Sequence, residues 1–404
     1  MNVPAQGTEI PAKSQDLAAV NQAAMRAMAA GDFGGAEAIL MQGLARDRGN
    51  FTAWLNLAAT RRQKNDVDGA FLALREALAI EPRNFHALLM TATLLDREGR
   101  AVPAATAYGA ALANAPPDER LDPATLEAVR RGREVRAKYA RELGGFIRDQ
   151  VATAQDHCTA GERRRVERFI DTTLRVRERY QQQPTDYYYP GLPSIEFYER
   201  DEFPWLAGLE AATTAIQDDL ARVLQQDEAG FSPYIHYEDH LPLDQWRELN
   251  NSPRWTAFHF YEQGRRVEER CARAPATIAA VERLPQAHVP LRSPTAMYSC
   301  LRPRTRIPPH VGIANFRLVV HLPLVLPDGC SFRVGGETRQ WRLGEAWVFD
   351  DTIEHEARND SDETRIILIC DVWNPRLSAE ECAAIAQVIA ATDSFNGTVP
   401  SAEG

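Results

Sequence analysis

The sequence has no long apolar run, few cysteines and no excess of basic charge. No stretch approaches the roughly 18 to 20 consecutive apolar residues of a membrane-spanning helix, and the opening MNVPAQGTEIPAKSQDL lacks the apolar core of a secretory signal. The six cysteines stand singly, without a CxxC pair, so a disulfide scaffold is not indicated. These absences favour a cytoplasmic protein with free thiols and no membrane span.

The charge balance argues against nucleic acid as a partner. The formal net charge is −10 and the isoelectric point is about 5.5, whereas proteins that grip phosphate backbones need a broad basic face. The proportions of hydrophobic and charged residues, 44% and 25%, are those of an ordinary globular protein. At 404 residues the chain is long enough for two or three domains of about 150 residues each.

Three similar units follow one another at a spacing of 34 residues, over residues 17–50, 51–84 and 85–117. Large and small apolar residues return at the same offsets, and Pro82 and Pro116 stand where the second helix of a pair would end. Small residues at a crossing let two helices approach closely, while larger residues fill the groove between them. The pattern resembles the tetratricopeptide repeat (TPR) and predicts a short α-helical solenoid.

Two roles are open for these repeats. They could hold a protein partner on the concave face of the solenoid, or they could only brace the rest of the chain. We expect residues 1–16 to form a flexible tail and residues 118–184 to form a helical connector. The arginines of the connector are interleaved with acidic residues, which favours a solvated helix face over a site for an anion.

Beyond residue 185 the pattern changes from helix to strand. Apolar and polar residues alternate between turn residues from about Thr295 onward. The predicted strands are Ala296 to Arg302, Phe316 to Leu326, Ser331 to Val334, Arg339 to Arg342, Ala346 to Phe349 and Arg365 to Trp373. Short antiparallel strands at this density predict a double-stranded β-helix, the jelly-roll or cupin-like fold, whose mouth can hold a metal and a small acid.

The predicted architecture is therefore a multidomain α + β protein. A TPR-like solenoid precedes a jelly-roll domain at residues 185–391, which ends in a helix that opens at a capping box on Ser378. Residues 392–404 are expected to form a loose tail. The glycines of RVGGET predict a hairpin turn and not a phosphate-binding loop, since no helix follows them.

Four side chains of the strand-rich part suggest chemistry. His310 and His355 each lie at a strand edge beside turn residues, and Arg365 begins the apolar segment RIILICDVW. An arginine that points into a barrel needs an anionic partner, and Ser299 could add a hydroxyl to the same carboxylate. Imidazoles suit Fe(II), and positions left open on the metal admit a cosubstrate and O2. Together these residues predict a non-haem Fe(II) centre that uses 2-oxoglutarate.

The segments PPHVGIANFRLVVHLPL, CSFRVGGETRQW, EAWVFDDTIEHEARN and RIILICDVWNPRLS resemble the aspartyl/asparaginyl β-hydroxylase family, with a similarity that covers roughly residues 187–377. The animal members resemble this chain also in a TPR-like N-terminal region. The resemblance implies that His310 and His355 bind iron. It also implies that Arg365 and Ser299 anchor the distal carboxylate of 2-oxoglutarate. His321 is then the histidine near its other carboxylate, and Arg317 is the arginine that lines the substrate site.

Departures from the wider class of oxygenases bear on both metal and substrate. Gly312 stands two residues after His310, where most of these enzymes have a carboxylate ligand and the animal β-hydroxylases have glycine; with water in that position, we expect weak retention of iron. Val319 replaces a second arginine of the animal enzymes, which removes a cation from the substrate site. We interpret Asp350 and Asp351 as residues of a turn or of the metal's outer surroundings, and not as ligands.

The resemblance implies hydroxylation of Asp or Asn residues in a polypeptide, with O2 as oxidant and with succinate and CO2 as coproducts. One alternative keeps this chemistry and changes the substrate to a free amino acid, a carrier-bound amino acid or a lipid acyl chain. Another is a non-catalytic TPR scaffold with a degenerate barrel.

Overall fold

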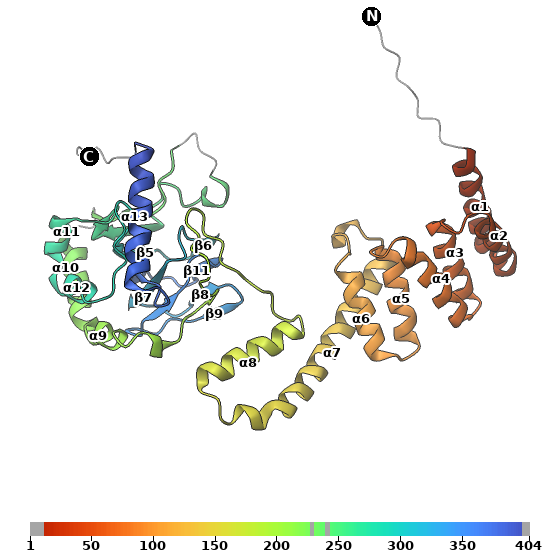
Figure 1. The fold of residues 1–404 in the computed structure, drawn as a ribbon, viewed down its shortest axis with the longest axis horizontal. Helices are drawn as coiled ribbons and strands as arrows, with labels where there is room; N and C mark the ends of the chain where they lie inside the picture. Colours follow the sequence, from red (N-terminus) through yellow and green to blue (C-terminus); the bar gives the residue numbers. More distant parts are fainter. Residues whose placement is uncertain (1–11, 227–229, 239–242, 398–404) are drawn as a thin grey trace, which may run out of the picture. The chain divides into compact units, whose positions relative to one another are not determined.

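The computed structural model describes residues 12–226, 230–238 and 243–397, and Figure 1 shows their arrangement as a ribbon. The contacts within the chain divide it into two compact units, Met1–Val176 and Arg177–Gly404. The first unit is helical, and the second holds the sheets.

The first unit contains three pairs of antiparallel helices at the predicted spacing. The pairs are α1 (Ala12–Ala29) with α2 (Phe33–Arg46), α3 (Phe51–Gln63) with α4 (Val67–Ile80), and α5 (Phe85–Arg97) with α6 (Ala101–Leu112). Asn50 and Asn84 cap α3 and α5 at equivalent positions, because each side chain accepts a hydrogen bond from a backbone N–H of the first turn. The TPR-like register is therefore confirmed. Helix α1 begins five residues before the predicted start, and residues 1–11 of the predicted tail lie outside the described part.

Small residues lie in the core of these pairs, as the repeat pattern predicted. Ala58, Ala73 and Ala77 are fully buried beside Leu57 and Leu74 in one apolar cluster. An alanine at a crossing point leaves room for the neighbouring helix, so substitution by a larger side chain would push the helices apart.

The predicted helical connector contains two helices, and the first of them packs on the last helix pair. After a 3-10 turn at Asp118–Arg120, α7 (Pro123–Gln155) packs its first turns on α6. A Cβ at Gly132 would lie 2.5 Å from Cδ1 of Tyr108, so only glycine allows this approach. The exposed Arg148 of α7 forms ion pairs with Glu167 and Asp171 of α8 (Ala160–Thr173), as expected for a solvated helix face.

The second unit contains two antiparallel sheets, and the strands that build them are β1 (Ser232–Pro233), β2 (Trp255–His259), β5 (Ala296–Leu301), β6 (Thr305–His310), β7 (Arg317–Val325), β8 (Cys330–Val334), β9 (Glu337–Arg339), β10 (Trp347–Phe349), β11 (His355–Asn359) and β12 (Arg365–Trp373). The larger sheet has the order β1-β2-β5-β12-β7-β10, and the smaller has the order β6-β11-β8-β9. A hairpin of β3 (Tyr261–Glu262) and β4 (Arg265–Arg266) stands apart.

Side chains of both sheets meet in one apolar cluster. Leu301 and Ile367 of the larger sheet belong to it together with Ile307, Phe332 and Ala357 of the smaller sheet. Two antiparallel sheets packed over a shared interior make the predicted double-stranded β-helix. The α + β fold class is confirmed.

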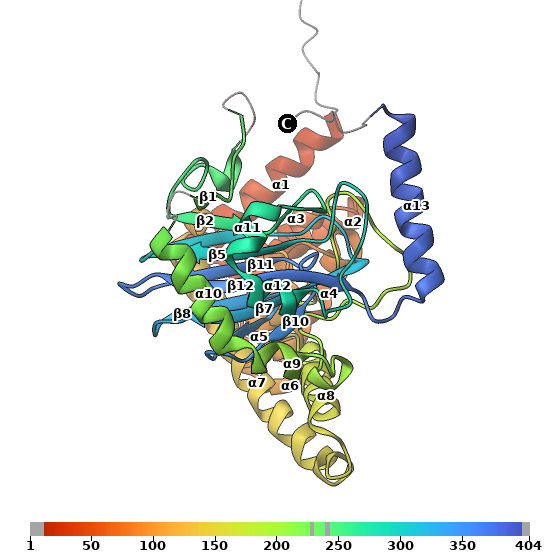
Figure 2. The same ribbon diagram turned by 90° about the vertical axis from the view of Figure 1, so that its left-hand side faces the viewer.

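Helices cover the outer face of the larger sheet. They are α9 (Leu206–Ala211), α10 (Thr213–Gln226), α11 (Glu268–Arg273) and α12 (Pro275–Val281), and Figure 2 shows α10 and α12 in front of the strands. Leu220 and Ile278 share an apolar cluster with Tyr298 and Leu368 of the sheet. The alternate residues of the same strands face the other sheet, so both faces are buried and the strands are apolar almost throughout.

Six strands were not predicted: the two-residue strands β1, β3 and β4, and the longer strands β2, β6 and β11. β6 contains Pro308 and Pro309, and β11 has the polar sequence HEARN, so neither has the usual pattern of a strand. The strand predicted at Arg339 to Arg342 lies instead at Glu337–Arg339. Helix α13 (Ala379–Phe395) opens at the predicted capping box but runs four residues beyond its predicted end. The last residues of the predicted tail, 398–404, lie outside the described part.

The turn and cysteine predictions are confirmed. Gly335 and Gly336 form the two-residue turn of the hairpin β8–β9, and Gly335 has φ = +53°. All six cysteines lie in the described part of the chain, and none of them forms a disulfide. Within the described ranges, none of the helices combines the length and the apolar character needed to cross a bilayer.

Candidate two-histidine site

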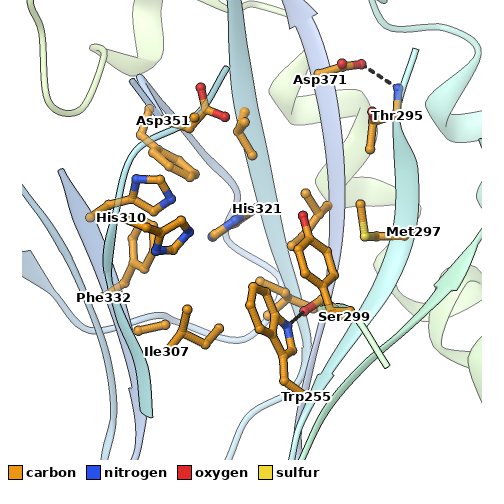
Figure 3. A pocket seen from close by; sticks show the side chains of 18 of the residues that line it. Trp255, Thr295, Met297, Ser299, Ile307, His310, His321, Phe332, Asp351 and Asp371 are labelled. Carbon is orange, nitrogen blue, oxygen red and sulfur yellow. Dashed lines mark hydrogen bonds between the residues drawn. The ribbon is translucent and has the colours of Figure 1, made fainter. Parts of the chain in front are cut away.

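A cavity of about 360 Å³ lies between the two sheets of the second unit. It is lined by every residue that the sequence analysis assigned to the site: Ser299, His310, Arg317, His321, His355 and Arg365. Figure 3 shows the imidazoles of His310 and His321 directed into this space from the two sheets. The fold thus brings together residues that are up to 66 positions apart (365 − 299).

His310 and His355 meet because their strands pair. His310 ends β6, His355 begins β11, and the two residues are opposite each other in the antiparallel ladder. Their ring centroids are 4.0 Å apart, with an angle of 51° between the ring planes. The pairing shifts register directly after His355, so a bulge accompanies this position. Cross-strand neighbours on one face are the closest approach that a sheet offers.

Backbone carbonyls fix the tautomer of both imidazoles. Nδ1 of His310 lies 2.8 Å from the carbonyl oxygen of Pro308, and Nδ1 of His355 lies 3.1 Å from that of Ile353. Because a carbonyl only accepts hydrogen bonds, each Nδ1 carries the proton and each Nε2 keeps its lone pair. Burial lowers the pKa of His310 to about 3, with a further contribution from the neighbouring imidazole, and burial lowers the pKa of His355 to about 4. Both rings are therefore neutral at pH 7, the form that binds metals.

A carboxylate fills the space beside Gly312. A Cβ on Gly312 would lie 2.2 Å from Oδ2 of Asp351, so no side chain can stand at position 312 while Asp351 keeps its place. Asp351 is buried, and its Oδ1 accepts no hydrogen bond from the described residues. No group of three or more His, Cys, Asp and Glu side chains that could hold a metal occurs within the described ranges. The potential ligands are thus two imidazoles with a carboxylate nearby.

Asp350 has the structural role expected of a turn residue. Its Oδ1 accepts hydrogen bonds from the backbone N–H and the hydroxyl of Thr352, and its Oδ2 accepts one from Gln182. Burial raises the pKa of Asp350 to about 6. Both oxygens of its carboxylate thus accept hydrogen bonds that stabilise the loop between β10 and β11.

Arg365 is a buried guanidinium without a carboxylate partner. It is the first residue of β12, only 1% exposed, and its Nε has no hydrogen-bond partner in the described part of the chain. The guanidinium carbon lies 5.2 Å from the ring centroid of Trp341. Burial lowers the pKa of Arg365 to about 10, so the side chain is still charged at pH 7. A buried charge of this kind needs an anion, and a surface salt bridge is excluded.

Ser299 and His321 lie on strands next to Arg365. Ser299 on β5 pairs with Ile367, two residues from Arg365 and on the same face of the sheet. Its oxygen accepts a hydrogen bond from Nε1 of Trp255, which leaves the hydroxyl hydrogen for another acceptor. His321 on β7 is 5% exposed, and burial and then the charge of Arg365 lower its pKa well below the ordinary value. This end of the cavity can therefore donate several hydrogen bonds to a carboxylate.

Arg317 differs from Arg365 in having acidic partners. Its Nη2 donates to Oδ2 of Asp351 at 3.1 Å, and its Nε lies 3.9 Å from Oδ2 of Asp371. Sequence reasoning missed Asp371, although the alternation along β12 places it on the same face as Arg365. It also missed Trp341 and Trp255 as pocket residues, because isolated tryptophans are ordinary core residues and Trp255 lies on an unpredicted strand.

The fold and the pocket define a double-stranded β-helix domain. Its pocket contains two neighbouring, neutral imidazoles and a buried guanidinium that can bind an acidic group. Residues 210–375 match the model of the family described as aspartyl/asparaginyl beta-hydroxylase. This segment of the chain is therefore similar to the aspartyl/asparaginyl β-hydroxylase family, as its motifs indicated.

Similar proteins include enzymes with different named substrates. The human aspartyl/asparaginyl beta-hydroxylase is 39% identical over 142 residues, which are 35% of this chain and 18% of that protein. The ornithine lipid ester-linked acyl 2-hydroxylase of Rhizobium tropici is 32% identical over 190 residues, which are 46% of this chain and 63% of that protein. The match thus spans less than two thirds of either relative. Among solved structures, the secretion chaperone SycD of Yersinia enterocolitica covers 34% of this chain and 97% of its own, at 16% identity and a TM-score of 0.28.

Proposed function

We propose that the second unit is an Fe(II)- and 2-oxoglutarate-dependent hydroxylase. The observation that carries the proposal is the pairing, within one cavity, of two neutral imidazoles with a buried guanidinium that has no carboxylate partner among the described residues. The imidazoles supply the donor atoms that suit Fe(II), and the guanidinium demands an acid. An internal space of about 360 Å³ separates them, so a small dicarboxylate can bridge the two.

Each residue has a defined task in this proposal. Nε2 of His310 and Nε2 of His355 would hold the metal, while their Nδ1–H groups stay bonded to backbone carbonyls that fix the ring orientation. Arg365 and the hydroxyl of Ser299 bind the distal carboxylate of 2-oxoglutarate, and His321 lies near its other carboxylate. Bound Fe(II) supplies the activation of O2 that hydroxylation of an unactivated carbon needs. The carboxylate of Asp351 fills the space beside Gly312, and its Oδ1 would accept a hydrogen bond from a ligand in the cavity.

The substrate that the family name suggests is an Asp or Asn residue of a polypeptide. The rhizobial relative, named for an acyl chain of ornithine lipid, favours a lipid as a second candidate. The alternative of a non-catalytic scaffold is less well supported, because the cavity is open and retains both imidazoles and the unpaired guanidinium.

Metal dependence provides the direct test. With only two protein ligands, the purified chain is expected to contain much less than one iron per molecule and to lose the rest to a chelator. Succinate release should then need added Fe(II) and 2-oxoglutarate, and mass spectrometry should detect a product heavier by one oxygen atom. Elemental analysis that finds one tightly held iron after chelator treatment would refute the two-ligand site. Failure of Fe(II) to support succinate release with any peptide, amino acid or lipid would refute the hydroxylase.

We propose further that the TPR-like unit presents a polypeptide to this reaction. Removal of residues 1–176 follows the boundary between the compact units and takes away α6 and α7 together, so neither helix is left without the other. Turnover of a polypeptide should fall at least about tenfold, a loss of about 1.4 kcal/mol of binding free energy, whereas turnover of a short peptide should not change. If the truncated chain turns over the polypeptide and the short peptide as fast as the full chain does, the proposal is refuted and the repeats only brace the second unit.

A further inference from the structure

One end of the pocket carries more acidic than basic groups. Asp351, Asp371 and Arg317 lie there, so two carboxylates share one guanidinium. Arg365 begins β12 and Asp371 is its seventh residue, which separates the cationic and acidic ends by about 20 Å along the strand. Figure 3 shows Asp351 and Asp371 on one side of the pocket, with Ser299 and Trp255 on the other.

Asp371 has an unused acceptor inside the pocket. Its carboxylate is 1% exposed, and Oδ1 accepts the backbone N–H of Thr295 at 2.8 Å. Oδ2 accepts no hydrogen bond from the described residues, and its distance of 3.9 Å from Nε of Arg317 is too long for one. A buried carboxylate oxygen that lacks a donor is costly, so a group that donates a hydrogen bond there would bind favourably.

The end of the pocket with Asp351 and Asp371 is unfavourable for an acidic group of a ligand. Arg317 already donates to Asp351, and its side chain is only 14% exposed. Val319 is the cross-strand neighbour of Asp371 and adds an apolar surface. A carboxylate placed here would face two others with no free cation among these groups, which is unfavourable in a buried site.

Aromatic rings line other parts of the same pocket. Tyr234 stacks on Trp255, with ring centroids 4.0 Å apart, and Trp246 lies edge-on to His310 at 5.0 Å. All three aromatic residues line the pocket, and Tyr234 is 37% exposed. The faces of such rings attract ammonium and guanidinium groups.

We propose that the substrate carries a positively charged group, an ammonium or a guanidinium, that donates a hydrogen bond to Asp371. The inference rests on the proposed function, since it names the class of substrate that the same pocket takes. According to this inference, the end of the pocket with Asp351 and Asp371 binds a cationic side chain of the substrate in preference to an aspartate side chain.

Binding to the full chain without metal tests this inference directly. The probes are the N-acetyl amides of lysine, arginine and aspartate, and calorimetry measures their affinity. The lysine and arginine probes should bind at least about tenfold more tightly than the aspartate probe, as expected for a charge-assisted hydrogen bond. Asp371→Asn keeps the acceptor for Thr295 and should remove most of this preference. Asp362→Asn, at a side chain that is 83% exposed, is the matched control and should change nothing.

A second variant covers the case in which Asp371→Asn fails to fold. Val319→Arg places a guanidinium beside Asp371, so the cationic probes should lose affinity and the aspartate probe should gain it. Tighter binding of the aspartate probe to the natural chain, unchanged preference in both variants, or no binding of either cationic probe would overturn the inference. Succinate release tests the proposed function separately: cation binding without release refutes only that function, and release with a preference for aspartate refutes only the inference.

Discussion

Alanine in place of either pocket histidine is expected to abolish succinate release. His310 and His355 are the two imidazoles that supply free Nε2 atoms to one space, and within the described ranges no third metal-binding side chain joins them. Loss of one donor leaves a single ligand, and a metal held by one imidazole dissociates readily. We expect activity to fall by about a hundredfold or more in each variant, since even loss of a group behind a ligand costs about 10- to 100-fold.

The readout should separate metal binding from folding. Titration of the chelator-treated variants with Co(II) should fail to give the absorption bands that the natural protein gives, while their circular dichroism spectra stay unchanged. His288→Ala, at an exposed histidine outside the pocket, serves as the control and should keep both properties. Turnover near that of the natural protein in His310→Ala or His355→Ala would end the metal assignment.

Replacement of Arg365 by methionine should have two opposite effects. The KM for 2-oxoglutarate should rise by about a hundredfold, since the distal carboxylate loses its charged partner, while kcat at saturation changes much less. The ligand-free protein should become as stable as the natural one or more stable. The reason is that the buried guanidinium of Arg365 in the natural protein has lost its hydration, and no carboxylate of the described residues compensates for this loss.

Thermal denaturation with and without 2-oxoglutarate measures both effects together. The natural protein should gain stability as the acid is added, by about 2.7 kcal/mol at a concentration of a hundred times the dissociation constant. Arg365→Met should begin at an equal or higher melting temperature and show no gain. Arg342→Met, at a side chain that is 78% exposed, should behave like the natural protein. A strong loss of stability in Arg365→Met without ligand would mean that the guanidinium has an internal structural partner.

Local sequence patterns predicted the helical unit well. The spacing of 34 residues fixed the starts of α3 at Phe51 and α5 at Phe85, because helix packing within a repeat depends on residues near one another in sequence. The beginning of α7 lies in the predicted helical connector and packs on α6. Its place beside Tyr108 depends on the absence of a side chain at Gly132, and a single glycine in a long helix has no distinctive pattern.

The barrel was predicted in outline and missed at its most important strands. β5, β7 and β12 have the apolar composition of strands that are buried on both faces. β6 and β11 lack this apolar composition, and the pairing between them is irregular, because these strands carry His310 and His355. Departure from the usual pattern at a functional position is therefore the reason for the miss.

The motifs by themselves pointed to six residues that all line the pocket: the two histidines, Arg365, Ser299, His321 and Arg317. Only the tertiary structure decided which of these groups are still available to a ligand. In the part of the chain that the structure describes, Arg365 has no acidic partner, whereas Arg317 is held by Asp351, and Oδ2 of Asp371 accepts no hydrogen bond. Pairing between charges depends on distances across strands that are far apart in the chain, and a linear pattern carries no information on those distances.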